Sequence, residues 1–263
     1  MFRKILIANR GEIAVRIIRA ARELGIETVA VYSTADKEAL HTLLADEAVC
    51  IGPAKSTESY LNMNAVLSAA VLTGSEAIHP GFGFLSENSK FATMCEEVGI
   101  KFIGPSGSVM DMMGDKINAR EQMIKAGVPV IPGSDGEVHT AEEALEVADR
   151  IGYPVMLKAS AGGGGKGIRK VERAEDLVPA FESASTEAKA AFGNGAMYLE
   201  RVIYPARHIE VQILADQFGH VVHLGERDCS LQRNNQKVLE ESPSVAIGKT
   251  IRDQIGSAAV RAA

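Results

Sequence analysis

The stretch Pro154–Val171, PVMLKASAGGGGKGIRKV, decides the fold, because it places a glycine-rich loop between an apolar run and a short second segment, each with the pattern of a β-strand. A Walker A loop needs Ser or Thr after its Gly-Lys pair, whereas Gly167 follows Lys166 here. A Rossmann turn needs a helix to begin on the glycines, but Ile168–Val171 has the pattern of a strand. Two interpretations stay open: a β-hairpin whose loop closes over a triphosphate, and a mobile surface hairpin.

Two lysines favour the interpretation in which the loop closes over a triphosphate. Lys158 ends the first strand directly before the loop, and Lys116 begins a helical stretch after Met-Gly-Asp. Either lysine alone is typical of an exposed side chain. Together with the loop, they supply the cations that phosphate oxygens require.

The N-terminal region has the pattern of a parallel α/β domain. Lys4–Ala8 is a short apolar run, apolar residues then repeat at helical spacing up to Gly25, and Thr28–Tyr32 is a second apolar run. Strand, helix and strand within about 30 residues predict a parallel sheet. The same alternation continues with helices near 64–72 and 89–98 and strands at 77–79 and 100–103.

The segment His79–Leu85, HPGFGFL, lies where one of these strands ends. Sheets of this kind bind ligands beyond the carboxyl ends of their strands, so the segment is either a ligand-facing loop or a turn with its aromatic rings in the core. The first strand–helix turn lacks G-x-G-x-x-G, which argues against a dinucleotide there.

The second half of the chain predicts two further units. Two prolines and two glycines in Gly127–Gly133 mark a boundary after a helix at 116–126. A small α+β unit follows, with helices at 141–150 and 175–190 and strands at 154–158, 168–171 and 197–200. Arg207–Leu214 alternates with period two and turns at Asp216–Gly219 into a strand at 220–224, which predicts an antiparallel hairpin. A helical stripe at Ile251, Ile255 and Ala259 reaches residue 263 without a stop signal, so we expect the last domain to be incomplete.

Composition excludes several classes of protein. The chain of 263 residues is 46% hydrophobic and 24% charged, which is ordinary for a globular protein, and its net charge of -6 argues against a nucleic-acid or acidic-membrane binder. The 3 cysteines have no metal-ligand or disulfide spacing, and no apolar run is long enough for a membrane span. The N-terminus does not resemble a signal peptide, so a cytoplasmic location is expected.

Along essentially its whole length the chain resembles the N-terminal part of biotin carboxylase, an ATP-grasp enzyme. The segments that carry the resemblance are ILIANRGEIAVRIIRAARELGI, ADEAVCIGP, AIHPGFGFLSEN, FIGPS, MGDK, AGVPVIPGSDG, IGYPVMLKASAGGGGKG, YLERVI and ERDCSLQRNNQKVLEESP. The implied fold is α/β, with a Rossmann-like preATP-grasp domain at 1–113, a connecting helix and linker at 114–130, an ATP-grasp lid at 131–203, and the beginning of the C-terminal ATP-grasp domain at 204–263.

The resemblance also implies functional residues. Lys116 and Lys158 would bind the nucleotide phosphates under a lid loop that contains Gly164 and Gly165. Glu200 and the backbone of Val202 would contact adenine. The remaining implied residues are His208 near the ribose, Gln232 near phosphate and biotin, Lys237 as the catalytic residue facing the γ-phosphate and bicarbonate, and Phe82 and Gly83 in the loop that faces biotin.

Two positions depart from the family. Asn235 stands where many biotin carboxylases have histidine, so an uncharged amide would replace an imidazole in binding phosphate or biotin. Phe82 stands where tyrosine is common, which keeps a stacking ring and removes a hydroxyl.

The reaction implied by the resemblance is ATP-dependent carboxylation of biotin on a carrier protein, through carboxyphosphate. The Mg²⁺ ligands and the general base would lie beyond residue 263, so no metal ligand is expected within the chain and the fragment alone is expected to be inactive. Implied partners are the biotin carboxyl carrier protein, carboxyltransferase subunits and a second copy. We favour acetyl-CoA carboxylase in fatty-acid synthesis over a propionyl- or pyruvate-type enzyme. A different ATP-grasp ligase, a non-catalytic ATP-binding module and an oxidoreductase are the competing classes of protein.

Overall fold

The computed structural model describes residues 1–114, 116–160, 167–233 and 236–263. The chain divides into two compact units, Met1–Ala119 and Arg120–Ala263. Helix α6 (Lys116–Lys125) spans the division between them.

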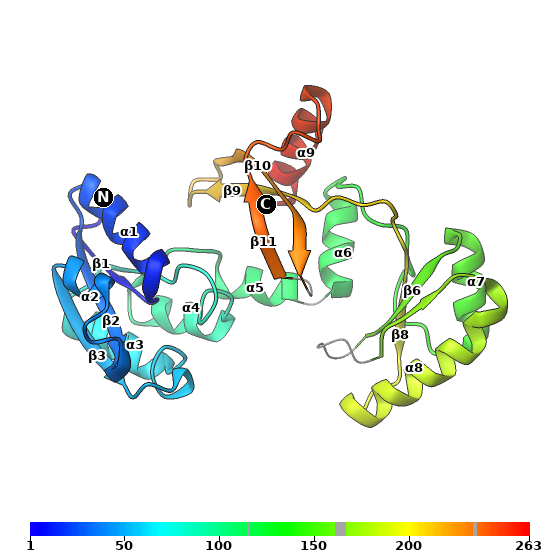
Figure 1. Ribbon diagram of the computed structural model, residues 1–263, viewed down its shortest axis with the longest axis horizontal. Coiled ribbons are helices and arrows are strands. Elements are labelled where there is room, and N and C mark those ends of the chain that lie inside the picture. Colours follow the sequence, from blue (N-terminus) through cyan, green and yellow to red (C-terminus); the bar gives the residue numbers. More distant parts are fainter. Residues whose placement is uncertain (115, 161–166, 234–235) are drawn as a thin grey trace. The chain divides into compact units, whose positions relative to one another are not determined.

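The first unit is built on a five-stranded sheet with strand order β3-β2-β1-β4-β5, and every pair of neighbours is parallel (Figure 1). This confirms the parallel sheet predicted from the strand–helix–strand pattern. The strands are β1 (Lys4–Ile7), β2 (Glu27–Ser33), β3 (Glu47–Gly52), β4 (Ala77–His79) and β5 (Lys101–Phe102), and the helices are α1 (Gly11–Glu23), α2 (Leu40–Leu44), α3 (Met63–Leu72), α4 (Ser89–Glu97) and α5 (Gly107–Gly114).

The central strand β1 is apolar because both faces of the sheet are covered. Leu6 belongs to one buried cluster with residues of β2, β4, α3 and α4. Ile5 and Ile7 belong to a second buried cluster with α1 on the opposite face. Alternate residues of a strand point to opposite faces, so a run that is apolar throughout fits a sheet that is buried on both sides.

Some elements of the first unit differ from the sequence prediction. The structure adds α2, β3 and α5, which the sequence patterns did not indicate. Strand β3 lies at the edge of the sheet beside β2, and most of its residues are exposed or half-buried although Ala48–Ile51 is apolar. Gly25 has φ +70°, which confirms the predicted left-handed turn after α1.

The second unit begins with an antiparallel three-stranded sheet of order β7-β6-β8, covered by two helices. Its elements are α7 (Ala141–Ile151), β6 (Val155–Ala159), β7 (Arg169–Val171), α8 (Leu177–Phe192) and β8 (Met197–Arg201). Val155 pairs with Val171, which confirms the predicted hairpin around the glycine loop. The loop residues 161–166 lie outside the described residues. Gly167 has φ +67°, and a Cβ added there would lie 2.9 Å from the Ala159 Cβ, so this end of the hairpin requires glycine.

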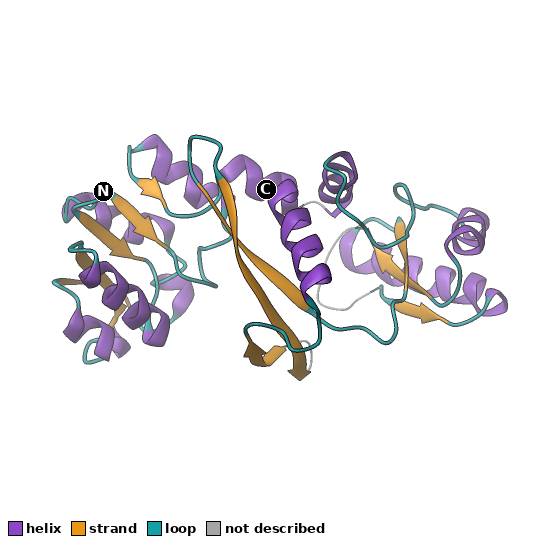
Figure 2. Ribbon diagram, turned by 90° about the horizontal axis from the view of Figure 1, so that it is seen from above, coloured by secondary structure: helices purple, strands orange, loops and turns teal. Residues whose placement is uncertain are grey.

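A second antiparallel sheet in this unit has the order β11-β10-β9, with helix α9 packed along it (Figure 2). Its elements are β9 (Ile209–Ala215), β10 (Val221–Arg233), β11 (Gln236–Glu241) and α9 (Lys249–Ala262). The hairpin of β9 and β10 confirms the prediction, but the strand expected at 220–224 continues to Arg233 and pairs with a third strand. Apolar and polar residues do not alternate regularly along this extension, so its sequence does not have the pattern of a strand.

Among the described residues, no helix has the length and apolar character that a membrane span requires.

Candidate functional site

The hairpin strand β6 and its neighbour β8 bring two predicted site residues together. Lys158 lies opposite Tyr198, and Glu200 lies opposite Met156, so both charged side chains leave the same face of the sheet. The Lys158 Nζ donates a hydrogen bond to the Glu200 Oε2. The two side chains are 33% and 23% exposed, respectively, so the pair is reachable from solvent but partly shielded.

The position of Glu200 is set by the segment that pairs with the other edge of β8. Ser134 donates its backbone N–H to the Leu199 carbonyl and accepts the Leu199 N–H on its hydroxyl, over 2.9 and 3.2 Å. Gly133 lies opposite Glu200, and a Cβ at Gly133 would lie 2.6 Å from the Leu199 carbonyl oxygen. Close approach of two backbones therefore requires glycine at this position.

Val202 follows β8, and its backbone N–H donates to the Pro154 carbonyl over 2.8 Å. This bond ties the end of β8 to the residue just before β6. The N–H of Val202 is therefore used within the protein.

A second cluster of charges lies on the sheet of β9, β10 and β11, around Glu210. The Lys237 Nζ donates to the Glu210 Oε2, and the Arg227 Nε donates to the Glu210 Oε1 over 2.7 Å. These hydrogen bonds, first that of Lys237, lower the pKa of Glu210 to about 2. The hydrogen bond to Glu210 raises the pKa of Lys237, so Lys237 is held in its charged form.

His208 and Gln232 meet beside this cluster. The Gln232 Nε2 donates to the His208 Nδ1 over 3.0 Å and to the Cys229 carbonyl over 2.9 Å. Because Nδ1 accepts, the neutral His208 ring carries its proton on Nε2, which lies 3.7 Å from the Glu210 Oε2.

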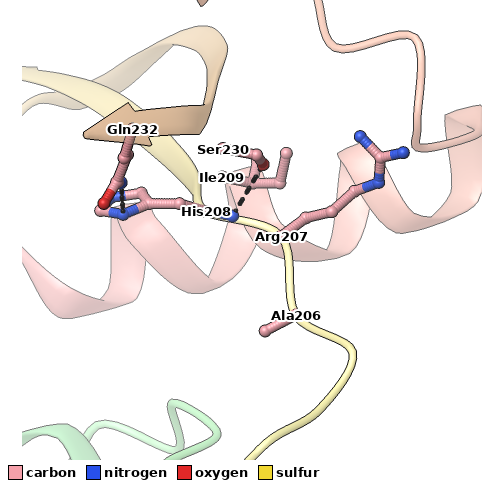
Figure 3. Close-up of a pocket in the computed structure, with 6 residues that line it drawn as sticks. All are labelled: Ala206, Arg207, His208, Ile209, Ser230 and Gln232. Carbon is pink, nitrogen blue, oxygen red and sulfur yellow. Dashed lines mark hydrogen bonds between the residues drawn. The ribbon is translucent and has the colours of Figure 1, made fainter. Parts of the chain in front are cut away.

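His208 and Gln232 line a pocket of about 490 Å³ with Ser230, whose hydroxyl accepts the His208 backbone N–H (Figure 3). The other residues that line it are Ala206, Arg207 and Ile209. In Figure 3 the Arg207 side chain extends away from His208 and Gln232. The two predicted residues therefore line the same pocket.

One group of potential metal ligands occurs among the described residues, formed by Glu210, Cys229 and Glu240, whose ligand atoms lie within 4.8 Å of one another. This donor set does not fit Mg²⁺. Magnesium requires oxygen ligands in octahedral geometry, whereas this set includes a thiol, and both Glu210 oxygens already accept hydrogen bonds from Lys237 and Arg227.

The loop after β4 lines a separate pocket within the first unit, of about 410 Å³. Phe82 and Gly83, both predicted from the resemblance, lie in it, and the Phe82 side chain is 64% exposed. The pocket also includes Asn9 and Asp36, which follow β1 and β2. It therefore lies at the carboxyl ends of three parallel strands, where ligands of such sheets are expected.

Four predicted residues cannot be placed. Gly164, Gly165 and Asn235 lie outside the described residues. Lys116 is the first residue of α6, and its side chain also lies outside the described part of the chain.

Two residues of the charged cluster were not selected from the sequence. Glu210 shares its strand face with His208 and Gln212, and this alternation was the available signal. Arg227 had no such signal, because it reaches Glu210 only through the pairing of β10 with β9, in which the two residues lie directly opposite each other.

Fold and site together define the class of protein. A parallel α/β unit is followed by an antiparallel glycine-loop hairpin and by a second antiparallel sheet, and each of the latter two carries a lysine paired with a glutamate. This is the arrangement of an ATP-grasp protein. Residues 1–110 match the family model of the biotin carboxylase N-terminal domain, and residues 115–263 match that of the carbamoyl-phosphate synthase L chain ATP-binding domain.

The chain belongs to the biotin carboxylase family, and the proteins most similar in sequence include biotin carboxylases. Biotin carboxylase 1 of Bacillus subtilis is 59% identical over 263 residues, which is 100% of this chain and 58% of that protein. The chain therefore spans less than two thirds of that relative.

Solved structures show the same fold. A biotin carboxylase–β,γ-ATP complex from Campylobacter jejuni matches with a TM-score of 0.87 and 52% identity, over 100% of this chain and 59% of that chain. The biotin carboxylase domain dimer of Hydrogenobacter thermophilus 2-oxoglutarate carboxylase, solved with MgADP, ADP and bicarbonate, matches with a TM-score of 0.84 and 53% identity, over 100% and 58%.

Proposed function

We propose that this chain is the ATP-binding part of an enzyme that carboxylates biotin on a carrier protein, with bicarbonate and ATP as substrates. The observation that carries the proposal is the Lys158–Glu200 pair beside the glycine hairpin, in a chain 59% identical to a biotin carboxylase. The domain limits that fit this function are 1–113, 114–130, 131–203 and 204–263.

The phosphates of ATP would bind to Lys158, to Lys116 and to the loop that contains Gly164 and Gly165. In the structure, the Lys158 ammonium is neutralised by Glu200. A phosphate oxygen would compete for this ammonium, and the released carboxylate of Glu200 would then accept a hydrogen bond from the exocyclic amine of adenine. The Val202 N–H already donates to Pro154, so an adenine contact from Val202 would use its carbonyl.

Lys237 would act as a cation toward the γ-phosphate and bicarbonate. Its pKa is raised by Glu210, so it suits charge stabilisation and does not suit proton removal. Glu210, with a pKa of about 2, is too weak a base to deprotonate bicarbonate. Glu210 would therefore hold Lys237 in place, while His208, Gln232 and Asn235 contact the ribose, phosphate and biotin.

When bound, Mg²⁺ would offset the negative charge that develops on the phosphates during transfer. We infer that its protein ligands and the general base belong to other parts of the enzyme. The chain by itself should then bind ATP without turning it over. Bicarbonate-dependent ATP hydrolysis by the purified 263-residue chain at an ordinary enzymatic rate would contradict this inference.

The ATP site can be tested by calorimetric titration of the chain with ATP. Substitution Lys158→Ala should weaken binding about tenfold or more, because a hydrogen bond to a charged group contributes about 1.5–3 kcal/mol. The matched control is Lys170→Ala on β7, where the lysine pairs with Glu172 and is 47% exposed. Equal affinity of the Lys158→Ala variant and the unsubstituted chain would refute the site.

We further propose that the enzyme serves acetyl-CoA carboxylase in fatty-acid synthesis, in the cytoplasm, as a homodimer that works with a biotin carboxyl carrier protein and carboxyltransferase subunits. The alternative is a pyruvate- or propionyl-type carboxylase. This alternative is supported by the similarity to the biotin carboxylase domain of a 2-oxoglutarate carboxylase, since that enzyme carboxylates a substrate other than acetyl-CoA. Depletion of the protein in its host separates the two. Rescue of growth by fatty acids supports the first, and rescue by a dicarboxylic acid supports the alternative.

A further inference from the structure

The loop from His79 to Leu85 is held to the end of β1 by one buried side chain. Asn9 is 4% exposed, and its Nδ2 donates to the Pro80 carbonyl over 2.7 Å and to the Phe82 carbonyl over 2.8 Å. Its Oδ1 accepts the Arg10 N–H over 2.9 Å. Both amide protons and the oxygen of Asn9 are thus used, and two of the three bonds go to the loop on either side of Gly81.

The loop approaches Asn9 too closely for any residue but glycine at its centre. Gly81 has φ +64°, and a Cβ there would lie 2.8 Å from the Asn9 Nδ2 and 3.2 Å from the Ile13 side chain. The contact therefore depends on two residues: the Asn9 amide donates two hydrogen bonds to the loop, and Gly81 has no side chain that would clash with it.

A second brace holds the far end of the same loop. The Phe84 ring stacks on Tyr60 at 5.1 Å, and the Arg10 guanidinium lies 5.7 Å from the Phe84 ring centroid. Tyr60 is 1% exposed and donates its hydroxyl to Asp36 over 2.6 Å. Phe84 has φ +44°, a conformation that a bulky residue adopts only when its surroundings hold it.

Between these braces, the Phe82 side chain remains 64% exposed at the pocket, while its backbone carbonyl is bonded to Asn9. An exposed aromatic ring on a fixed backbone presents a flat surface in a defined position. A ligand that stacks on it loses less freedom on binding than one that must first order the loop.

We propose that Asn9 is a positioning residue, which acts through Phe82 and orders that ring for stacking against the ring system of biotin. This rests on the function proposed above for the choice of ligand. The positioning itself rests on the hydrogen bonds of Asn9 and on the close approach of Gly81.

The chain has 0 tryptophans, so Phe82→Trp provides a single fluorescent indole at the position in question. In this background Asn9→Asp keeps the size of the side chain but turns the double donor into an acceptor that faces two carbonyl oxygens. We expect the amplitude of fast indole motion in anisotropy decay to rise about twofold, and amide exchange at Gly81 to accelerate about tenfold, as a locally opened segment should. Asn9→Ala, which removes the donors without adding charge, should give the same direction of change.

The matched control is Asn62→Ala in the same background. Asn62 caps α3 by accepting the Ala65 N–H over 3.1 Å, so its loss also destabilises the first unit but leaves the loop bonds in place. It should leave the motion of the indole unchanged. Amide exchange at Leu6 and Ile78 in each variant verifies that the sheet is folded.

Free biotin is then titrated, and the fluorescence of the same indole reports its binding. The half-saturating concentration should be about tenfold higher for Asn9→Asp than for its parent, because misplacement of a contact group weakens binding. Indole motion that is unchanged in both Asn9 variants, or raised equally by Asn62→Ala, would overturn the positioning role, as would equal biotin affinity in parent and variant. If the parent itself gives no response to biotin, the biotin assignment fails, and the anisotropy and exchange measurements alone decide the role of Asn9.

Discussion

The parallel sheet of β1–β5 and the antiparallel sheet of β9–β11 are held together by different forces. In the first, the central strands are buried on both faces, and Leu6, Val29 and Ile78 are 0% exposed. In the second, β11 is exposed along its whole length and Leu214 of β9 is 60% exposed. The first sheet is stabilised by apolar burial on both faces, whereas the second buries less apolar surface and carries several paired charges.

The charged pairs of the second sheet are placed where its backbone is most covered. Glu226 is 2% exposed and accepts from the Arg252 Nε of α9 over 2.7 Å. Asp228 is 7% exposed and accepts from the Ser244 hydroxyl over 3.0 Å. Buried carboxylates need such donors, since an unpaired buried charge is strongly unfavourable. Their donors lower the pKa values of Glu226 and Asp228, so acid should weaken the second sheet through these carboxylates.

The largest expected effect is loss of apolar packing in the first sheet. Leu6→Ala should lower the free energy of unfolding of the first unit by about 2–5 kcal/mol, because it leaves a cavity in a closely packed core. Leu214→Ala, the same change on the exposed face of β9, should cost less than about 0.5 kcal/mol. Urea unfolding followed by amide exchange of each unit measures both. Similar losses for the two substitutions would remove the distinction between the sheets.

A smaller effect is expected from Glu210 in the second sheet. Its folded pKa of about 2 lies below its ordinary value of 4.5, so its stabilisation is complete above about pH 4.5 and is lost as the pH falls toward 2. Allowing for solvent screening, the loss amounts to about 2 kcal/mol. Glu210→Gln should therefore flatten the pH dependence of amide protection in β9 and β10 between about pH 4.5 and 2.

The control for that experiment is Glu241→Gln, at the exposed end of β11. It should retain the pH dependence of the unsubstituted chain. If both variants flatten the profile equally, the acid sensitivity does not come from the Glu210 cluster.

The smallest effect is expected at an exposed ion pair of α9. Lys249 donates to Asp253 over 2.8 Å, and the two side chains are 88% and 61% exposed. Such i,i+4 pairs contribute only about 0.3–0.5 kcal/mol, so Lys249→Ala should lower the melting temperature of the second unit by no more than a degree or two. A large decrease in calorimetry would show that surface charges matter more to this unit than its buried pairs suggest.

The two sheets also differ in how well their strands could be predicted. The predicted strands β1, β2, β4, β6 and β7 occur where the patterns indicated, and β1, β2 and β6 are largely apolar. Strand β3 and the extension of β10 were not predicted. Strand β3 is an edge strand, and β10 extends through the polar residues up to Arg233, because pairing with β9 and β11 and not its own apolar pattern forms it.

Sequence by itself determined the family, the parallel sheet and the hairpin around the glycine loop, since these depend on local periodicity and on long runs of matching residues. Only the tertiary structure decided which charges meet. Glu210 lies 17 residues from Arg227 and 27 from Lys237 along the chain, and Asn9 lies 73 from Phe82. Contacts over such separations are set by strand order and register, which the pattern of single residues does not encode.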